Sequence, residues 1–210
     1  ENICTMKKIA LLFAIILPLA LNAQKSGIPE KYAAGAVPVV DGAVVFSKDY
    51  TLKNKTSEQI FDSLLAYANA LIHSENSLPQ CKISTNDKAN NLIAVNMEET
   101  MYFKRKAWVT DYTRCYYQLL YQIKDGGFTV TMRNIRYLYE EERNGGFQYD
   151  AESWITDEAA LVKKGKKLSR LSGKFRTKTI DRKDQLFEES YLAAGGKKKV
   201  RKVIYEEVEE

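Results

Sequence analysis

The chain has 210 residues, of which 45% are hydrophobic and 28% are charged, and its formal net charge is +5. On a prior of about 100–200 residues per domain, this is the length of one domain. The composition is ordinarily globular and excludes wholesale disorder. Four prolines, and glycines without a period, exclude collagen-like and low-complexity chains. One histidine and three cysteines leave little material for a metal site, so we expect no metal and no other cofactor.

The first 23 residues have the order of a secretory signal peptide. Residues 6–8 are a short basic segment, the apolar run 9–21 follows, and Ala23 is a small residue at the expected cut. The run is shorter than the ~20 residues that span a membrane, although a buried helix or a membrane anchor stays the alternative. Residues 1–5 contain no methionine, and we expect them to precede the native start. The prediction is an exported protein, periplasmic or extracellular, with no transmembrane segment after cleavage.

An extended arm, a strand and a helix are predicted next in chain order. Residues 24–42 contain glycines and prolines without a sustained period, which indicates an N-terminal arm. Residues 44–50 have the β-branched and aromatic content of a first strand. Residues 56–73 are the clearest helix, because Thr56 and Gln59 match a capping box and apolar side chains recur at helical spacing.

Three long strands are predicted from alternation of apolar and polar residues. Only Glu99 breaks the apolar face of the strand 92–103. The turn Asp125-Gly126 joins the second and third of these strands. It pairs Ile123 with Phe128, which places the apolar side chains of both strands on one face. Beyond Met132 the apolar phase shifts, and we expect a bulge near residues 133–134.

The C-terminal third is predicted to return to helix. We expect a short helix at residues 154–162 and a full helix from Asp181, as its N-cap, to residues 195–196. A single domain is expected over residues 43–195, followed by a charged tail at 196–210. The fold class is therefore α+β, with a curved antiparallel sheet of four to five strands and two helices packed on one face.

The chain resembles a family of uncharacterised secreted proteins from Gram-negative bacteria, a domain of unknown function with a TATA-binding-protein-like fold. The resemblance covers about residues 37–195. It implies the fold but supplies no catalytic residue, ligand or activity. The segments that carry it are Val44-Val45-Phe46, Ser57-Glu58-Gln59-Ile60-Phe61, residues 114–136, residues 152–158 and residues 173–181.

The sequence offers no catalytic constellation. His73 is the only histidine, and a solvated histidine at a helix end is the alternative to a dyad with Cys81 or Cys115. Export and an even number of cysteines in the mature chain favour a disulfide between Cys81 and Cys115 as a hypothesis. The alternative is that Cys115 is a small hydrophobic residue of the core.

Three residues are candidates for a ligand site on the sheet face or in the cleft between the sheet and the helices. Tyr116 and Tyr121 belong to a group of sheet tyrosines that could stack on sugar rings or bases, or pack across strands. Glu99 lies in phase with the apolar face, where a buried carboxyl could orient a ligand or act as an acid. The alternatives are that a bulge turns it to water or that an arginine such as Arg133 pairs with it.

A basic run offers a patch for an anionic partner, although a solvated loop is the alternative. Its residues are Lys163, Lys164, Lys166, Lys167, Arg170, Lys174 and Arg176.

We therefore expect a non-catalytic binding or interaction module of the cell envelope, whose partner is an envelope protein, a lipid or an anionic glycan rather than nucleic acid. The alternatives are an envelope hydrolase that uses carboxylates and a binder of anionic glycan through the basic run. A buried Glu99 beside a second acid would favour the hydrolase, whereas a paired Glu99 would favour the binding module.

Overall fold

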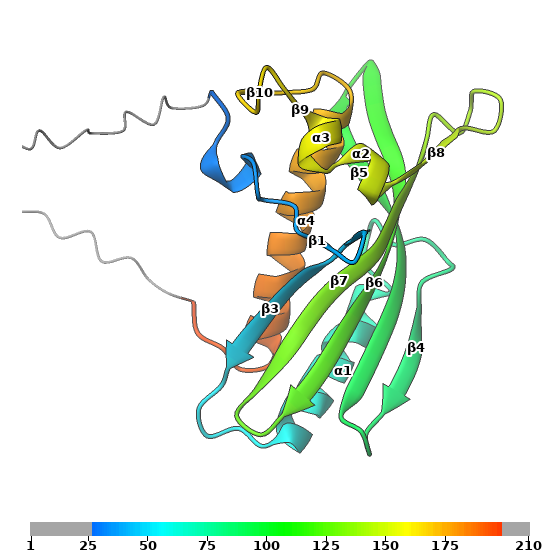
Figure 1. Cartoon of the computed structure of the whole chain (residues 1–210). Coiled ribbons are helices and arrows are strands. Elements are labelled where there is room, and N and C mark those ends of the chain that lie inside the picture. The colour runs from blue at the N-terminus through cyan, green and yellow to red at the C-terminus, as the bar shows by residue number, and fades with distance from the viewer. Residues whose placement is uncertain (1–26, 199–210) are drawn as a thin grey trace, which may run out of the picture.

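An antiparallel sheet covered on one face by two helices forms the body of the protein (Figure 1). The computed structural model describes residues 27–198. Within them six strands pair in the order β3-β7-β6-β5-β4, with β8 also on the free edge of β7. The strands are β3 (Phe46–Thr51), β4 (Lys82–Asp87), β5 (Leu92–Lys106), β6 (Val109–Lys124), β7 (Gly127–Tyr139) and β8 (Phe147–Asp150). The covering helices are α1 (Ser57–Leu71) and α4 (Ser172–Ala193). The predicted α+β fold class is confirmed, and the short edge strands β4 and β8 were not predicted.

The β6–β7 hairpin has the predicted register. Ile123 pairs with Phe128, and the pairing continues outward from the turn in the expected phase. Gly126 adopts a φ of +75°, which its missing Cβ makes inexpensive. Asn134 adopts a φ of +55° where the register shifts, so the predicted bulge is present. Alternation and turn chemistry therefore determine this hairpin together.

Helix α1 begins with the predicted capping box. The Gln59 amide donates to Thr56 Oγ1 at 3.3 Å, and the Thr56 amide donates to Gln59 Oε1 at 3.2 Å. Asp125 Oδ1 in the β6–β7 turn accepts from the Ser57 amide at 2.7 Å, which fastens the helix start to the sheet. The apolar face of α1 then packs on the sheet, and the hydrophobic core lies between sheet and helices.

Helix α4 begins at Ser172, nine residues before the N-cap expected at Asp181. Phe175 and Ile180 are buried in the first half of the helix. Their packing stabilises a helix in a basic segment whose sequence alone resembles a solvated loop. Asp181 is instead a mid-helix residue that accepts from Lys31 Nζ at 2.6 Å and from the Tyr32 hydroxyl at 2.7 Å.

The expected short helix at residues 154–162 is replaced by several small elements. They are α2 (Ala151–Trp154), α3 (Asp157–Ala160) and the hairpin of β9 (Leu161–Val162) and β10 (Lys167–Leu168).

The described part of the N-terminal arm packs against the domain. It contains η1 (Glu30–Tyr32) and the hairpin of β1 (Val39–Val40) with β2 (Ala43–Val44). The guanidinium of Arg176 is fully buried and donates to the carbonyls of Tyr32, Ala33 and Ile155 and to Asp157. The folded domain therefore starts before residue 43.

The predicted signal peptide lies outside the described residues, as do residues 199–210 of the predicted tail. Among residues 27–198, no helix is both long and apolar enough to cross a membrane.

Candidate functional site

The face of the sheet opposite the helices carries a hollow of about 630 Å³. Residues of β4, β5, β6 and β7 form its floor, and the start of the α2 segment forms one wall. Its polar and charged lining residues are Gln80, Lys82, Asn96, Glu98, Tyr116, Gln118, Asn134, Arg136, Asp150 and Glu152. We call this surface the open face.

Planar polar side chains are held in a row across the open face. Gln118 Nε2 donates to Asn96 Oδ1 at 2.9 Å, and Arg133 Nε donates to Gln118 Oε1 at 2.9 Å. The guanidinium of Arg136 lies 5.0 Å from the centroid of the Tyr116 ring, at cation–π distance. These contacts fix amide and guanidinium groups in orientations that hydroxyl or amide groups of a ligand can meet.

Glu98, which lines the hollow, belongs to a network of charged side chains. Arg114 donates to Glu98 Oε1 at 3.2 Å, and its Nε lies 2.5 Å from Glu141 Oε1. Burial, reinforced by the negative charge of Glu98, raises the pKa of Tyr116 above its usual value of 10.0. The Tyr116 phenol is therefore a neutral donor at physiological pH.

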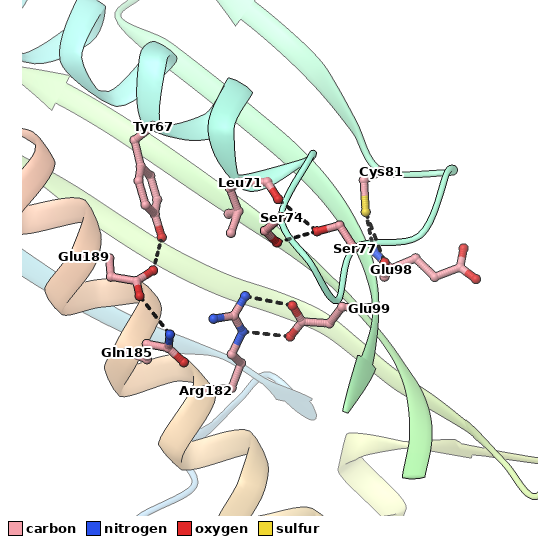
Figure 2. A network of polar contacts seen from close by, with 10 residues as sticks. All are labelled: Tyr67, Leu71, Ser74, Ser77, Cys81, Glu98, Glu99, Arg182, Gln185 and Glu189. Atoms are coloured by element: carbon pink, nitrogen blue, oxygen red, sulfur yellow. Dashed lines mark hydrogen bonds and ion pairs between the residues drawn. The ribbon is translucent and has the colours of Figure 1, made fainter. Parts of the chain in front are cut away.

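Glu99 lies on the opposite face of the sheet from the hollow, and its partner is Arg182 rather than Arg133 (Figure 2). Two hydrogen bonds of 2.8 Å join the guanidinium to the carboxylate, whose side chain is 3% exposed. Burial opposes the charge of Arg182, but the hydrogen bonds to Glu99, together with the electrostatic effects of Tyr117, Glu99 and Tyr67, raise the pKa of Arg182. Glu99 therefore joins β5 to α4 and is not a ligand-binding residue of the open face.

Tyr121 also lies on the helix side of the sheet and therefore not on the open face. Its side chain is fully buried, and its hydroxyl shares a 2.9 Å hydrogen bond with Ser190 Oγ of α4. Tyr67 of α1 makes a comparable contact there, donating to Glu189 at 2.9 Å (Figure 2). Of the predicted ligand residues, only Tyr116 lies on the open face.

Cys81 and Cys115 are free thiols, so the disulfide offered as a hypothesis is absent. Cys115 is buried on β6, whereas Cys81 lies just before β4 and its sulfur contacts the backbone of Glu98 at 3.1–3.2 Å (Figure 2). Strand β5 lies between β4 and β6 and separates the two sulfurs. His73 is exposed just beyond α1, while Cys115 is fully buried, so the structure does not assemble a cysteine–histidine dyad from them.

The predicted basic patch is divided by the fold. The β9–β10 hairpin exposes its four lysines, and Arg170 is exposed after it. Lys174 instead donates to Asp111 and to the Tyr139 hydroxyl, both at 2.8 Å, and Arg176 is buried against the N-terminal arm. Lys174 and Arg176 therefore do not belong to an exposed patch. Residues 27–198 also contain no group of three or more histidine, cysteine or acidic residues placed to hold a metal ion.

Asn96, Gln118 and Arg136 were not predicted as site residues. The signal was present, because Asn96, Gln118 and Tyr116 all fall on the polar phase of their strands. Arg136 comes to face Tyr116 only through the bulge at Asn134, which resets the phase of β7.

Comparison with known proteins places this geometry in a family. The family model described as domain of unknown function (DUF4468) with TBP-like fold matches residues 46–138. A DUF4468 family protein from Bacteroides ovatus ATCC 8483 is similar in structure, with a TM-score of 0.73, 36% identity, and coverage of 80% of this chain and 95% of that chain. A TBP-like protein from Parabacteroides distasonis ATCC 8503 is also similar, with a TM-score of 0.60 and 19% identity, and the match covers 77% of this chain and 99% of that chain. No curated protein matches the sequence.

Proposed function

The chain belongs to the DUF4468 family, and we propose that it is a non-catalytic binding module of the cell envelope that holds its partner on the open face of the sheet. The resemblance drawn from the sequence is confirmed for the family and for the TBP-like fold. Export is part of the proposal and rests on the signal-peptide pattern of residues 1–23.

The row Asn96–Gln118–Arg133 beside the Tyr116–Arg136 stack is the observation that carries the proposal. Binding sites combine a concave surface with a few oriented polar groups. Here the amides and guanidinium groups are already fixed by one another, so a ligand that meets them loses little additional side-chain freedom. Cations and carboxylates both line the hollow, which favours a polar ligand of low net charge that presents hydroxyl or amide groups.

The geometry gives less support to a carboxylate hydrolase. Glycoside hydrolases of this kind need one carboxyl group on each side of the scissile bond. Glu98 and Glu99 are neighbours on β5 and point to opposite faces, and each is held by an arginine. Glu152 Oε1 in the hollow accepts from the Val44 amide at 2.7 Å. These carboxylates are engaged in holding the fold.

Native mass spectrometry tests the proposal on protein produced with its own leader and purified from the periplasm without refolding. We expect removal of residues 1–23 and a non-covalent adduct of reproducible mass. The variant Tyr116→Ala/Arg136→Ala should lose the adduct. Lys48→Ala/Tyr50→Ala is the matched control, because Lys48 lies 4.7 Å from the centroid of the Tyr50 ring outside the hollow.

Each outcome of this experiment has a defined meaning. An adduct that survives in both variants contradicts binding on the open face. A clean unliganded mass for the wild type contradicts a tightly held small ligand there. A mass that retains the first 23 residues contradicts export through a cleaved leader.

A further inference from the structure

The β5–β6 hairpin ends in a tryptophan that the fold leaves almost entirely exposed. Trp108 is 96% exposed in the turn between the paired residues Lys106 and Val109, and Val109 is itself 48% exposed. Lys104, Arg105 and Lys106, all exposed, lead into this turn. Adjacent exposed apolar side chains rimmed by polar residues are typical of protein or membrane contact sites.

A second exposed hairpin carries more positive charge. The β9–β10 turn presents Lys163 and Lys164 at φ values of +53° and +57°, a left-handed conformation that favours glycine and asparagine. Val162 and Leu171 flank the basic segment and are 41% and 43% exposed. Two lysines therefore occupy turn positions whose backbone conformation glycine or asparagine would adopt at a lower energetic cost.

Contacts within the fold place the two hairpins at the same end of the molecule (Figure 1). The β9–β10 segment runs directly into α4, whose first turn contains Lys174 and Phe175. Lys174 Nζ bonds Asp111 at the base of the β5–β6 hairpin, and the Phe175 ring lies 4.5 Å from that of Phe103. We call this surface the basic end. Its cations are Lys104, Arg105, Lys106, Lys163, Lys164, Lys167 and Arg170.

Two acids near the basic end already pair with arginines outside it. In the turn after β7, Glu140 pairs with Arg143 and Glu141 pairs with Arg114. Arg105 has only a marginal surface pair, with 4.0 Å between its guanidinium and Glu75. Several cations beside exposed apolar side chains therefore remain available to one partner.

We propose that the basic end docks the protein onto a lipid bilayer that carries anionic headgroups, with Trp108 inserted at the interface. Tryptophan is enriched at the boundary between headgroups and acyl chains, and lysine and arginine beside it are attracted to anionic lipids. A soluble acidic glycan would use the cations but would leave Trp108 and Val109 in water. The apolar tip between two basic segments therefore favours the bilayer.

Vesicle flotation with the mature chain tests the proposal. The protein should float with vesicles of phosphatidylcholine mixed with phosphatidylglycerol and not with phosphatidylcholine alone. Each lysine near an anionic surface contributes about 1 kcal/mol, so Lys163→Gln/Lys164→Gln/Lys167→Gln should weaken partitioning by about a hundredfold at low salt. The matched control, Lys53→Gln/Lys55→Gln/Lys124→Gln, removes the same charge from exposed lysines at the opposite end and should bind as wild type.

Trp108 supplies a second readout, because the chain has only two tryptophans. In a Trp154→Phe background, the emission of Trp108 should shift to the blue on vesicle binding, and brominated acyl chains should quench it. Trp108→Ser should float less well at equal charge.

Three results would overturn the proposal. The first is failure of the wild type to float with the anionic vesicles. The second is flotation in which Trp108 is not quenched and Trp108→Ser binds as wild type, which would reduce the surface to a phosphate-binding loop. The third is displacement by soluble glycerol phosphate or an acidic polysaccharide at concentrations that match the lipid charge, which would assign the cations to a soluble ligand.

Discussion

The buried pair of Glu99 and Arg182 makes a sharp prediction about stability. Arg182→Met removes both 2.8 Å hydrogen bonds and leaves a carboxylate with 3% exposure without its partner. Breaking a buried pair in this way costs about 3–5 kcal/mol, against about 5–15 kcal/mol for the stability of a whole domain. With a urea slope of about 2 kcal/mol per M, the unfolding midpoint should fall by about 2 M.

The double variant Glu99→Leu/Arg182→Met separates the cost of burying the two charges from the attraction between them. Replacing both charges by apolar groups should return the free energy of unfolding to within about 1 kcal/mol of wild type or above it. Arg143→Met is the control, because Arg143 is 73% exposed in its pair with Glu140 and its loss should cost at most about 1 kcal/mol. Urea unfolding of the four proteins, followed by circular dichroism, measures these differences. If Arg182→Met is as stable as Arg143→Met, or the double variant is as unstable as Arg182→Met, the reasoning is refuted.

Two further predictions concern buried groups elsewhere. Arg176→Lys cannot reproduce the guanidinium fork that donates to Tyr32 and Ala33. It should cost about 2–3 kcal/mol and expose the arm at residues 27–42 to limited proteolysis, whereas an uncleaved arm would contradict its anchoring. Unfolded mature protein should take up two alkyl groups without reductant, while native Cys115 stays unmodified because burial raises the pKa of its thiol. An unfolded chain that takes up none would instead indicate a disulfide with Cys81.

Local signals predicted the parts of the fold that local chemistry determines. The β6–β7 hairpin combines strict alternation with Asp125-Gly126, and α1 combines a capping box with a helical apolar stripe. The first half of α4 was not predicted, because its basic residues resemble a solvated loop. Its helical state depends on burying Phe175 and on the reach of Arg176 to the distant arm. Such contacts are not encoded in a window of neighbouring residues.

The edge strands β4 and β8 were missed for a related reason. Each is short, with six and four residues. Strand β4 has only one apolar residue, Ile83, and the alternation in β8 covers only Phe147 and Tyr149. Their strand character comes from pairing with β5 and β7, which already have the pattern of long strands. Sheet pairing, rather than intrinsic preference, determines these segments.

The candidate site shows how much of a site the alternation of side chains along a strand can predict. Tyr116 and Tyr121 are five residues apart on one strand, so alternation places them on opposite faces and they cannot line one site. The same rule predicted that Glu99 lies with the apolar side chains. It did not identify Arg182 as the partner, because that contact spans 83 residues of sequence and depends on where α4 crosses the sheet.

The proposed surfaces occupy different parts of the molecule and can therefore be tested separately. The open face uses the middle of β5, β6 and β7, around Tyr116 and Gln118. The basic end uses the extension of β5 and β6 beyond the bulge that follows Tyr102. That bulge turns Phe103 toward Phe175, so the hairpin base is fastened to α4 while its tip, with Trp108, projects. A module built in this way could hold a ligand at the centre of its sheet while its extended strands contact a membrane.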